Sequence, residues 1–370
     1  MQFENKKPIL KLSILNKNIL FISPSNSIHS FKWIRFIYKN SDFNITWVSF
    51  YKKNINEEIP AGIEYHEIIE SNPFKTYNFL KSILFSRNFI CTHLHYIGRF
   101  SYLLLFLKVK NLIITPWGSD IKFLNTNPIK KFIVKRVLKK SNLITVDAEF
   151  MMEIVEKIIN DNKNIKRINF GTDTDFFKFY SRKMNFKKLE IVSLRNLEKI
   201  YSVDTLVKAA HILKNEYTID FNIDIYGIGS QYETLQAMIK SFDLESLVKM
   251  KGKFIYNDLP EILKNYNLYV STSTSDAGIA ASTSESMSTG LIPIIADNSE
   301  NNFWVSNNSG FLFKTKSPSD LANKIYNYLL LSEEIKINLS KNSREKIINH
   351  NSYSNEMNKM LKFYNVLLNE

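Results

Sequence analysis

The first half of the chain alternates short runs of β-branched and aromatic residues with longer amphipathic stretches. The short runs predict strands at residues 18–23, 45–50, 89–95, 111–115 and 143–146. The amphipathic stretches predict helices at residues 29–39, 99–108, 128–140 and 148–160. Strands that alternate with helices are typical of a parallel sheet covered on both faces. The pattern therefore predicts an α/β domain.

The same pattern starts again after a polar, aromatic segment at residues 172–188. Strands are predicted at residues 189–194 and 221–226 and near Val248 and Tyr269, and helices at residues 204–214 and after Gly229. Ser317 is a good helix cap, because a proline and an acid follow it in the first turn. Two more helices should complete the chain.

These elements predict two Rossmann-like halves with a cleft between them. We place a first domain at residues 1–171, a linker at 172–188, a second domain at 189–345 and a C-terminal helix at 346–370 that returns toward the first domain.

Composition agrees with two domains, because 370 residues with 44% hydrophobic content can fill two cores. The single cysteine, Cys91, excludes an intrachain disulfide and favours a reducing compartment. No segment is long enough and free enough of charge to span a membrane. Near the N-terminus, Glu4, Lys6, Lys7 and Pro8 stand where a signal peptide would be apolar. We therefore expect a cytoplasmic protein.

The net charge of +13 is concentrated in one half of the chain. Residues 1–180 hold 27 Lys and Arg against 15 Asp and Glu, whereas residues 181–370 hold 22 against 21. Such asymmetry favours an anionic partner for the first half, either a membrane surface, a phosphorylated lipid carrier or nucleic acid. Ordinary solubilising lysine in a sequence rich in Lys, Asn and Ile explains the count equally well.

Residues 271–295 carry the strongest chemical signal in the chain. A strand precedes small residues and then a helix, so the first backbone N–H groups of that helix are accessible to a phosphate. Glu285 lies one to two turns into the helix, where its carboxylate can accept hydrogen bonds from two ribose hydroxyls. The segment is typical of a nucleotide-diphosphate site, although a capped polar helix start has a similar pattern.

The order Asp276, Glu285-Ser286-Met287, Gly290 and Pro293 resembles the signature of the GT-B glycosyltransferases of family 4, E-x7-E followed by A-M-x-x-G-x-P. In this chain the two acids are nine positions apart rather than eight, and the first is Asp. Further segments resemble turns of the same family, at residues 169–176, 227–229 and 251–253. The resemblance implies an α/β fold of the GT-B type, with two Rossmann-like domains facing a central cleft.

The resemblance also implies a function. The implied protein is a retaining, metal-independent hexosyltransferase that moves a sugar from a nucleotide-diphosphate sugar to a glycan or lipid-linked acceptor. The first domain would bind the acceptor and the second the nucleotide sugar, with no cofactor, in the synthesis of lipopolysaccharide or another surface polysaccharide. The resemblance implies catalytic roles for Asp276, Arg195, His95 and Asp120. The donor would contact Glu285, Arg195, Lys199, Gly227, Lys253, Gly278, Ile279 and Ala280.

Arg195 follows the first strand of the second half, as does the basic pair in the family's G-R-L-x-x-x-K-G segment. A planar guanidinium binds phosphate oxygens in pairs, so we assign Arg195 to the donor diphosphate. Lys199 falls one position early for the lysine of that pair. A surface ion pair with Glu198 is the alternative for Lys199.

Several polar residues of the first half follow predicted strands. His29 either points into the cleft or caps the first helix. His93 and His95 lie on one side of a strand but lack a third metal ligand at a matching spacing, so we assign one or both to the acceptor pocket, as in a similar family segment. Asp120 ends a segment that resembles the family's T-x-W-G-S-D, which implies a place at the floor of the cleft; a helix N-cap is the alternative.

Two segments mix apolar and basic residues. Residues 128–140 fit either a headgroup interface or a helix packed on the sheet, and we favour packing. Residues 74–89 carry more aromatic residues than one buried face needs, so we expect contact with a membrane or a lipid-linked acceptor there. We therefore expect a cytoplasmic enzyme that is peripheral on the inner membrane face.

Four other classes stay open on the sequence alone. An epimerase of the same fold would convert the nucleotide sugar without an acceptor. An oxidoreductase is disfavoured because G-x-G-x-x-G follows the first strand of neither half. A nucleic-acid-binding module would use the basic half, but no recognised motif is present, and we expect no nucleic acid partner. An inactive family member that only binds a partner is the fourth.

Overall fold

The computed structural model describes residues 17–69, 72–121, 127–160, 164–182, 188–276, 278–306 and 308–368. The chain forms two compact units. Unit 1 comprises Met1–Thr145, Ile154–Lys166 and Lys359–Glu370, and unit 2 comprises Val146–Glu153 and Arg167–Asn358. Residues 4–8, on which the signal-peptide prediction depends, and residues 183–187 of the predicted linker lie outside the described residues.

Unit 1 is built on a seven-stranded sheet in the order β3-β2-β1-β4-β5-β6-β7. The recorded pairings from β3 through β6 are all parallel. The strands are β1 (Asn18–Ile22), β2 (Asn44–Ser49), β3 (Glu64–Glu67), β4 (Phe89–His95), β5 (Leu112–Thr115), β6 (Leu143–Val146) and β7 (Ile165–Arg167). The helices of this part of the chain are α1 (Ile28–Asn40), α2 (Pro73–Ser86), the 3-10 helix η1 (Ser101–Leu105), α3 (Pro128–Lys140) and α4 (Glu149–Ile159).

The last helix of the chain, α12 (Tyr353–Val366), brings a buried tyrosine into unit 1. The hydroxyl of Tyr364 is hydrogen-bonded to Nδ1 of His93, and Nε2 of His93 lies 2.7 Å from Oγ1 of Thr115. The Tyr364 ring also packs against Phe21 and Phe43. The side chain of Tyr364 therefore belongs to the core of unit 1.

Unit 2 contains a six-stranded parallel sheet in the order β10-β9-β8-β11-β12-β13. Its strands are β8 (Leu189–Ser193), β9 (Phe221–Tyr226), β10 (Val248–Gly252), β11 (Leu268–Ser271), β12 (Ile292–Asp297) and β13 (Phe311–Lys314). Its helices are α5 (Asp204–Ile212), α6 (Tyr232–Ser241), α7 (Leu259–Leu263), α8 (Ala281–Ser288), α9 (Asn301–Trp304), α10 (Pro318–Leu329) and α11 (Glu333–Asn351). Shorter turns are η3 (Lys199–Tyr201), the π-helix η4 (Leu213–Tyr217) and η5 (Tyr256–Asp258).

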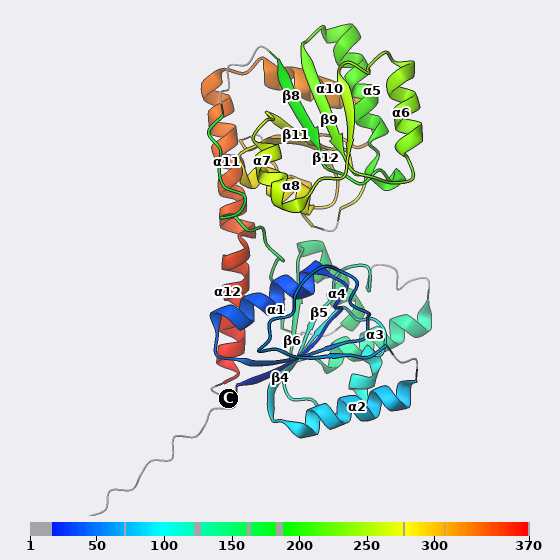
Figure 1. Ribbon diagram of the computed structural model, residues 1–370, viewed down its shortest axis with the longest axis vertical. Coiled ribbons are helices and arrows are strands. Elements are labelled where there is room, and N and C mark those ends of the chain that lie inside the picture. Colours follow the sequence, from blue (N-terminus) through cyan, green and yellow to red (C-terminus); the bar gives the residue numbers. More distant parts are fainter. Residues whose placement is uncertain are drawn as a thin grey trace, which may run out of the picture. The chain divides into compact units, whose positions relative to one another are not determined.

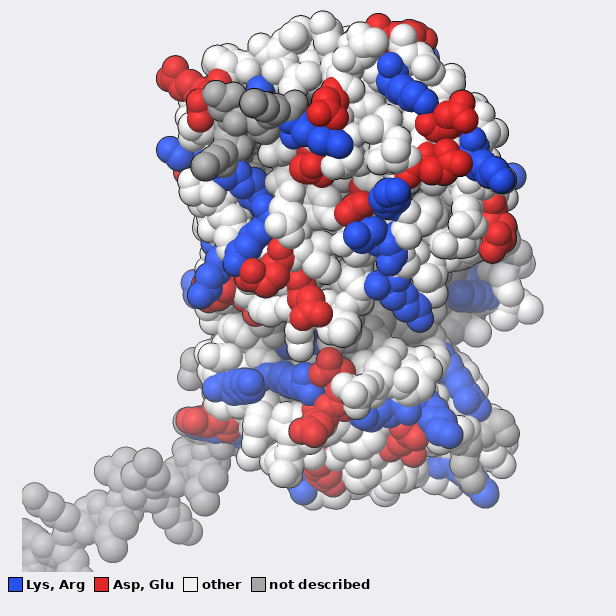
Figure 2. All heavy atoms as spheres, turned by 45° about the horizontal axis from the view of Figure 1, so that its top comes forward, with Lys and Arg blue, Asp and Glu red and all other residues white. Residues whose placement is uncertain are grey.

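Helices cover both faces of the unit 2 sheet, with α5, α6 and α10 on one side and α7 and α8 on the other (Figure 1). Successive strand residues point to opposite faces, so Ile191 joins the first core and Val192 the second. A strand buried on both faces reads as one continuous hydrophobic run. Basic and acidic side chains are interspersed over the visible surface of unit 2 (Figure 2), in line with its nearly balanced charge count.

Three local predictions were wrong or incomplete. The predicted helix at 99–108 is only the short η1, because Phe100 takes a left-handed conformation with φ 60° and the helix ends before Phe106. Strands β3, β7, β12 and β13 and helices α2, α7 and α9 were not assigned from the sequence. The described part of the predicted linker, from Thr172 to Arg182, packs within unit 2, where the Phe177 side chain is fully buried.

Candidate functional site

The sheet of unit 2 has a topological switch point between β8 and β11. From β8 the chain proceeds outward through β9 and β10, then crosses to β11 and proceeds the other way. In open parallel sheets, ligands bind outside the carboxyl ends of the strands at such a point. Arg195 follows β8, and Asp276 and helix α8 follow β11, so all three elements lie at this edge.

Arg195 and Asp276 form a buried ion pair at the switch point. Nη2 of Arg195 donates to Oδ1 of Asp276 over 2.6 Å, and the two side chains are 9% and 7% exposed. The guanidinium also lies 4.5 Å from the ring centre of Tyr201. Burial lowers the pKa of Arg195, but the neighbouring Tyr269 and Asp276 outweigh burial and raise it, so the side chain is a permanent cation.

The same arginine has an unused donor. Nε of Arg195 is buried and has no hydrogen-bond partner among the described residues. A buried donor without a partner is costly, and an anion at this position would satisfy it. The pair therefore leaves one N–H of the guanidinium unsatisfied in the described structure.

A glycine turn fixes the backbone of Arg195. Gly227 has φ 142°, and any side chain there would overlap the carbonyl oxygen of Arg195. The N–H of Gly227 donates to the carbonyl of Gly252 over 2.8 Å. Gly227 is therefore needed for the close backbone approach beside Arg195.

Helix α8 begins without a side-chain cap, because its N-cap residue is Ala280. Gly278, with φ 76°, and the half-buried Ile279 lead into it. Backbone N–H groups at an uncapped helix start, together with the helix dipole, favour an anionic ligand. The start of α8 and Arg195 thus place positive charge at the same edge of one sheet.

Glu285 lies in the second turn of α8 and is 8% exposed. Its Oε1 accepts a hydrogen bond from the hydroxyl of Tyr256 over 2.9 Å. The Tyr256 ring stacks on Phe176 at 5.8 Å and 20°. Burial and the Glu285 carboxylate raise the pKa of Tyr256, which therefore stays a hydrogen-bond donor. Neither aromatic residue was assigned to the site from the sequence.

The two predicted lysines of the site are on the surface of unit 2. Lys199 opens η3 and Lys253 follows Gly252, and both side chains are exposed. The sequence offered an ion pair with Glu198 as the alternative for Lys199. The Glu198 carboxylate instead accepts hydrogen bonds from the backbone N–H and the hydroxyl of Ser230, at 3.0 and 2.6 Å. Contacts of either lysine with a diphosphate stay predictions.

The predicted site residues of unit 1 are deeply buried. His95 and Asp120 are each 1% exposed. The His95 ring lies 4.8 Å from that of Trp33 and 4.2 Å from that of His93, and burial lowers the pKa of His95 to about 3. The imidazole is therefore neutral, and neither ring nitrogen has a hydrogen-bond partner among the described residues.

Asp120 connects two loops of unit 1. Its two carboxylate oxygens accept from the backbone N–H groups of Ile97 and Trp117, at 2.8 and 2.9 Å. Burial raises the pKa of Asp120, and these bonds oppose the rise. Asp120 lies in a turn rather than at a helix start.

His29 is not the cap of the first helix. Ser27 is the N-cap of α1, and its hydroxyl accepts a hydrogen bond from the backbone N–H of His29.

In the part of the chain that the structure describes, no group of three or more His, Cys, Asp and Glu side chains could hold a metal ion. The same described residues include no helix with the length and apolar character of a membrane span.

The fold and the switch-point site define an α/β protein with two Rossmann-like units of the GT-B class. Residues 176–346 match the family model of glycosyl transferases group 1, and residues 18–148 match that of glycosyl transferase 4-like proteins. Together the two matches cover most of the chain and identify it as a GT-B glycosyltransferase of the group 1 and family 4-like kind.

Solved structures with the same fold include a glycosyltransferase from Rickettsia africae, at 17% identity and a TM-score of 0.76, over 95% of this chain and 99% of that chain. HepE from Anabaena in complex with UDP and glucose is similar at 14% identity and a TM-score of 0.73, over 94% of this chain and 99% of that chain. A curated relative is the GtfA subunit of UDP-N-acetylglucosamine–peptide N-acetylglucosaminyltransferase from Limosilactobacillus reuteri, 28% identical over 128 residues. That match covers 34% of this chain, which spans only 24% of the relative's length.

Proposed function

We propose that this protein is a retaining glycosyltransferase that moves a hexose from a nucleotide-diphosphate sugar to a glycan or lipid-linked acceptor. The observation that carries the proposal is the buried Arg195, whose Nε lacks a partner in the described structure, at the same sheet edge as the uncapped start of α8. Uridine diphosphate is the first nucleotide to test, because HepE was solved with UDP and the GtfA subunit is named for UDP-N-acetylglucosamine.

In this proposal the donor diphosphate binds Arg195 and the first amides of α8, while Glu285 accepts hydrogen bonds from the ribose. When the bond between the sugar and the diphosphate breaks, negative charge builds on the leaving oxygen. Positive charge that is already in place stabilises this transition state. The acceptor hydroxyl attacks from the side that the diphosphate leaves, and its proton goes to the leaving phosphate oxygen. Asp276 orients the transferred sugar, and no metal is needed in this scheme.

We assign His95 and Asp120 to the shape of the acceptor-binding part of unit 1. Because both are buried, a positioning role is favoured over proton transfer to substrate. We place the reaction in the cytoplasm, at the inner face of the membrane, in the synthesis of a surface polysaccharide.

Nucleotide binding should raise the thermal stability of the protein. A ligand at 100 times its Kd stabilises the folded state by about 2.7 kcal/mol, which we expect to raise Tm by about 5 °C. The measurement is a thermal-shift series with UDP, UMP and uridine, in which UDP should give the largest rise because only it presents a diphosphate to Arg195. Equal shifts with uridine and UDP would contradict the diphosphate site. A donor sugar converted to an isomer without any acceptor would favour an epimerase instead.

Replacing Tyr256 by Phe should weaken donor binding without impairing the chemical step. The ring can still stack on Phe176, but the hydrogen bond that orients Glu285 is lost. A bond of this kind contributes about 0.5–1.5 kcal/mol, so KM for the donor should rise roughly 2- to 10-fold with kcat nearly unchanged. Steady-state kinetics over a range of donor concentrations measure both constants. A fall in kcat at unchanged KM would argue against an orienting role.

A further inference from the structure

Helix α2 turns aromatic side chains toward solvent. Its buried residues are Thr76, Leu80 and Ile83. On the outer face, Phe74 and Phe85 are each 79% exposed. They lie eleven positions apart, which is three helical turns, so both are on one side of the helix. Exposed aromatic residues that repeat along one face are typical of a contact surface.

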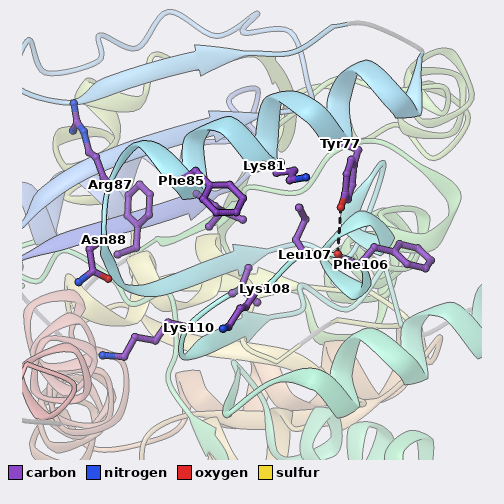
Figure 3. Close-up of a pocket in the computed structure, with 12 residues that line it drawn as sticks. Tyr77, Lys81, Phe85, Arg87, Asn88, Phe106, Leu107, Lys108 and Lys110 are labelled. Atoms are coloured by element: carbon purple, nitrogen blue, oxygen red, sulfur yellow. Dashed lines mark hydrogen bonds between the residues drawn. The ribbon is translucent and has the colours of Figure 1, made fainter.

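The same helix forms one wall of a groove of about 610 Å³ in unit 1 (Figure 3). The second wall is the segment 106–110, whose Phe106 is 69% exposed. The lining residues are Tyr77, Lys81, Leu84, Phe85, Arg87, Asn88, Phe89, Phe106, Leu107, Lys108, Val109 and Lys110. We call this the α2 groove.

Hydrogen bonds hold the second wall in place. The hydroxyl of Tyr77 donates to the carbonyl of Phe106 over 3.5 Å. Nζ of Lys140, at the end of α3, donates to the carbonyls of Leu105 and Leu107 at 3.2 and 2.7 Å. Phe106 is therefore held in its exposed position, because the backbone carbonyls of Phe106 and of both its neighbours accept hydrogen bonds.

The charge of the α2 groove has one sign. Its lining includes four cations and no carboxylate. Arg87 is paired with Glu64, at 2.9 Å, but Lys81, Lys108 and Lys110 form no ion pair with any described residue. A second hollow of the chain, about 580 Å³ beside α6, provides a comparison, because its lining contains Lys240 and Lys249 together with two glutamates. Unbalanced positive charge is thus a property of the α2 groove and not of every hollow in a lysine-rich chain.

We propose that the α2 groove docks on the anionic surface of a lipid bilayer. Phe74, Phe85 and Phe106 would enter the boundary between headgroups and acyl chains, and the three unpaired lysines would contact lipid phosphates. Leu84, Leu107 and Val109 add aliphatic surface beside the aromatic residues of the lining, which suits lipid acyl chains better than nucleic acid bases. The role of this surface in reaching a lipid-linked acceptor rests on the proposed function, but the binding itself requires no donor and no reaction.

Vesicle flotation of the full chain tests this proposal, with phosphatidylglycerol vesicles compared with phosphatidylcholine vesicles at low and high salt. The wild type should float with the anionic vesicles at low salt only. Each lysine near an anionic surface adds several-fold to binding, so Lys108→Glu with Lys110→Glu should weaken it by at least about tenfold. Lys240→Glu with Lys249→Glu changes the net charge equally and should have little effect. Phe85→Ser with Phe106→Ser should weaken binding more than the matched pair Leu330→Ser and Val366→Ser, whose residues are exposed elsewhere.

Several outcomes would overturn the proposal. If the two double lysine variants lost vesicle binding equally, the binding would depend on net charge and not on the α2 groove. Equal flotation with the zwitterionic phosphatidylcholine vesicles would exclude recognition of an anionic surface. Release by inorganic phosphate at constant ionic strength would indicate a small-anion site. Retention of an oligonucleotide in preference to vesicles would favour nucleic acid. Because the UDP thermal shift is measured on the same variants and should stay at the wild-type value, failure of docking is distinguishable from failure of the nucleotide site.

Discussion

Replacing Glu285 by Ala should abolish sugar transfer while the fold is retained. In the proposed complex the carboxylate accepts two hydrogen bonds from the ribose, and bonds to a charged group contribute about 1.5–3 kcal/mol each. Loss of both lowers kcat/KM by about 10²- to 10⁴-fold. Alanine is a good helix former, so α8 should persist, and Tyr256 is exposed enough for water to replace its partner. Transfer of labelled sugar and the Tm of the variant are the two measurements.

Two companions make this result specific. Glu285→Gln keeps the size of the side chain but not its charge, so its activity should lie between those of the wild type and Glu285→Ala. Glu261→Ala removes a carboxylate of the same unit that pairs with Lys264 on the surface, and it should transfer sugar at the normal rate. Full activity in Glu285→Ala, or equal losses in Glu261→Ala, would remove Glu285 from the site.

The elements whose observed bounds were predicted correctly are those whose own residues show a clear strand pattern or a clear helix start. Strand β4 is buried along its whole length, strand β9 alternates apolar and polar residues, and α3 has a proline in its first turn and Asn127 as its cap. Strand β3 has the sequence EYHE at the edge of its sheet and is only partly buried, so it shows neither pattern. Helix α2 was not assigned from the sequence because its exposed side carries phenylalanines while its buried side includes Thr76, which obscures the helical period.

Residues of the candidate site could be predicted from the sequence only where they stand at a recognisable position after a strand. Arg195 and Glu285 follow strands in a recognisable pattern, and the structure places them in unit 2 with Arg195 paired to Asp276. Tyr256 could not be found in this way, because its hydrogen bond to Glu285 depends on the approach of η5 and α8, which bring together residues 29 positions apart. The charge asymmetry of the first half was ambiguous as a count. Its physical meaning depends on which lysines meet in the α2 groove without carboxylates, and only the folded chain shows that.

Replacing Arg195 by Ala should impair both activity and stability, for separable reasons. Loss of one preorganised positive group at a developing charge lowers kcat by about 10²- to 10³-fold. The variant also leaves the Asp276 carboxylate buried and unpaired, and breaking a buried pair in this way costs about 3–5 kcal/mol. We therefore expect a lower Tm, a smaller UDP shift and loss of transfer.

The double variant Arg195→Ala with Asp276→Ala separates the two effects. It removes both charges, so most of the lost stability should return because no buried carboxylate is left without a partner. Activity and the UDP shift should stay low, since the diphosphate still lacks its arginine. Arg182→Ala is the matched control. That arginine is half-buried in the same unit and donates to the carbonyls of Leu263 and Thr289, so its loss should lower Tm but leave the UDP shift in place. If the double variant regained transfer along with stability, Arg195 would be a structural residue and the diphosphate would have to bind elsewhere.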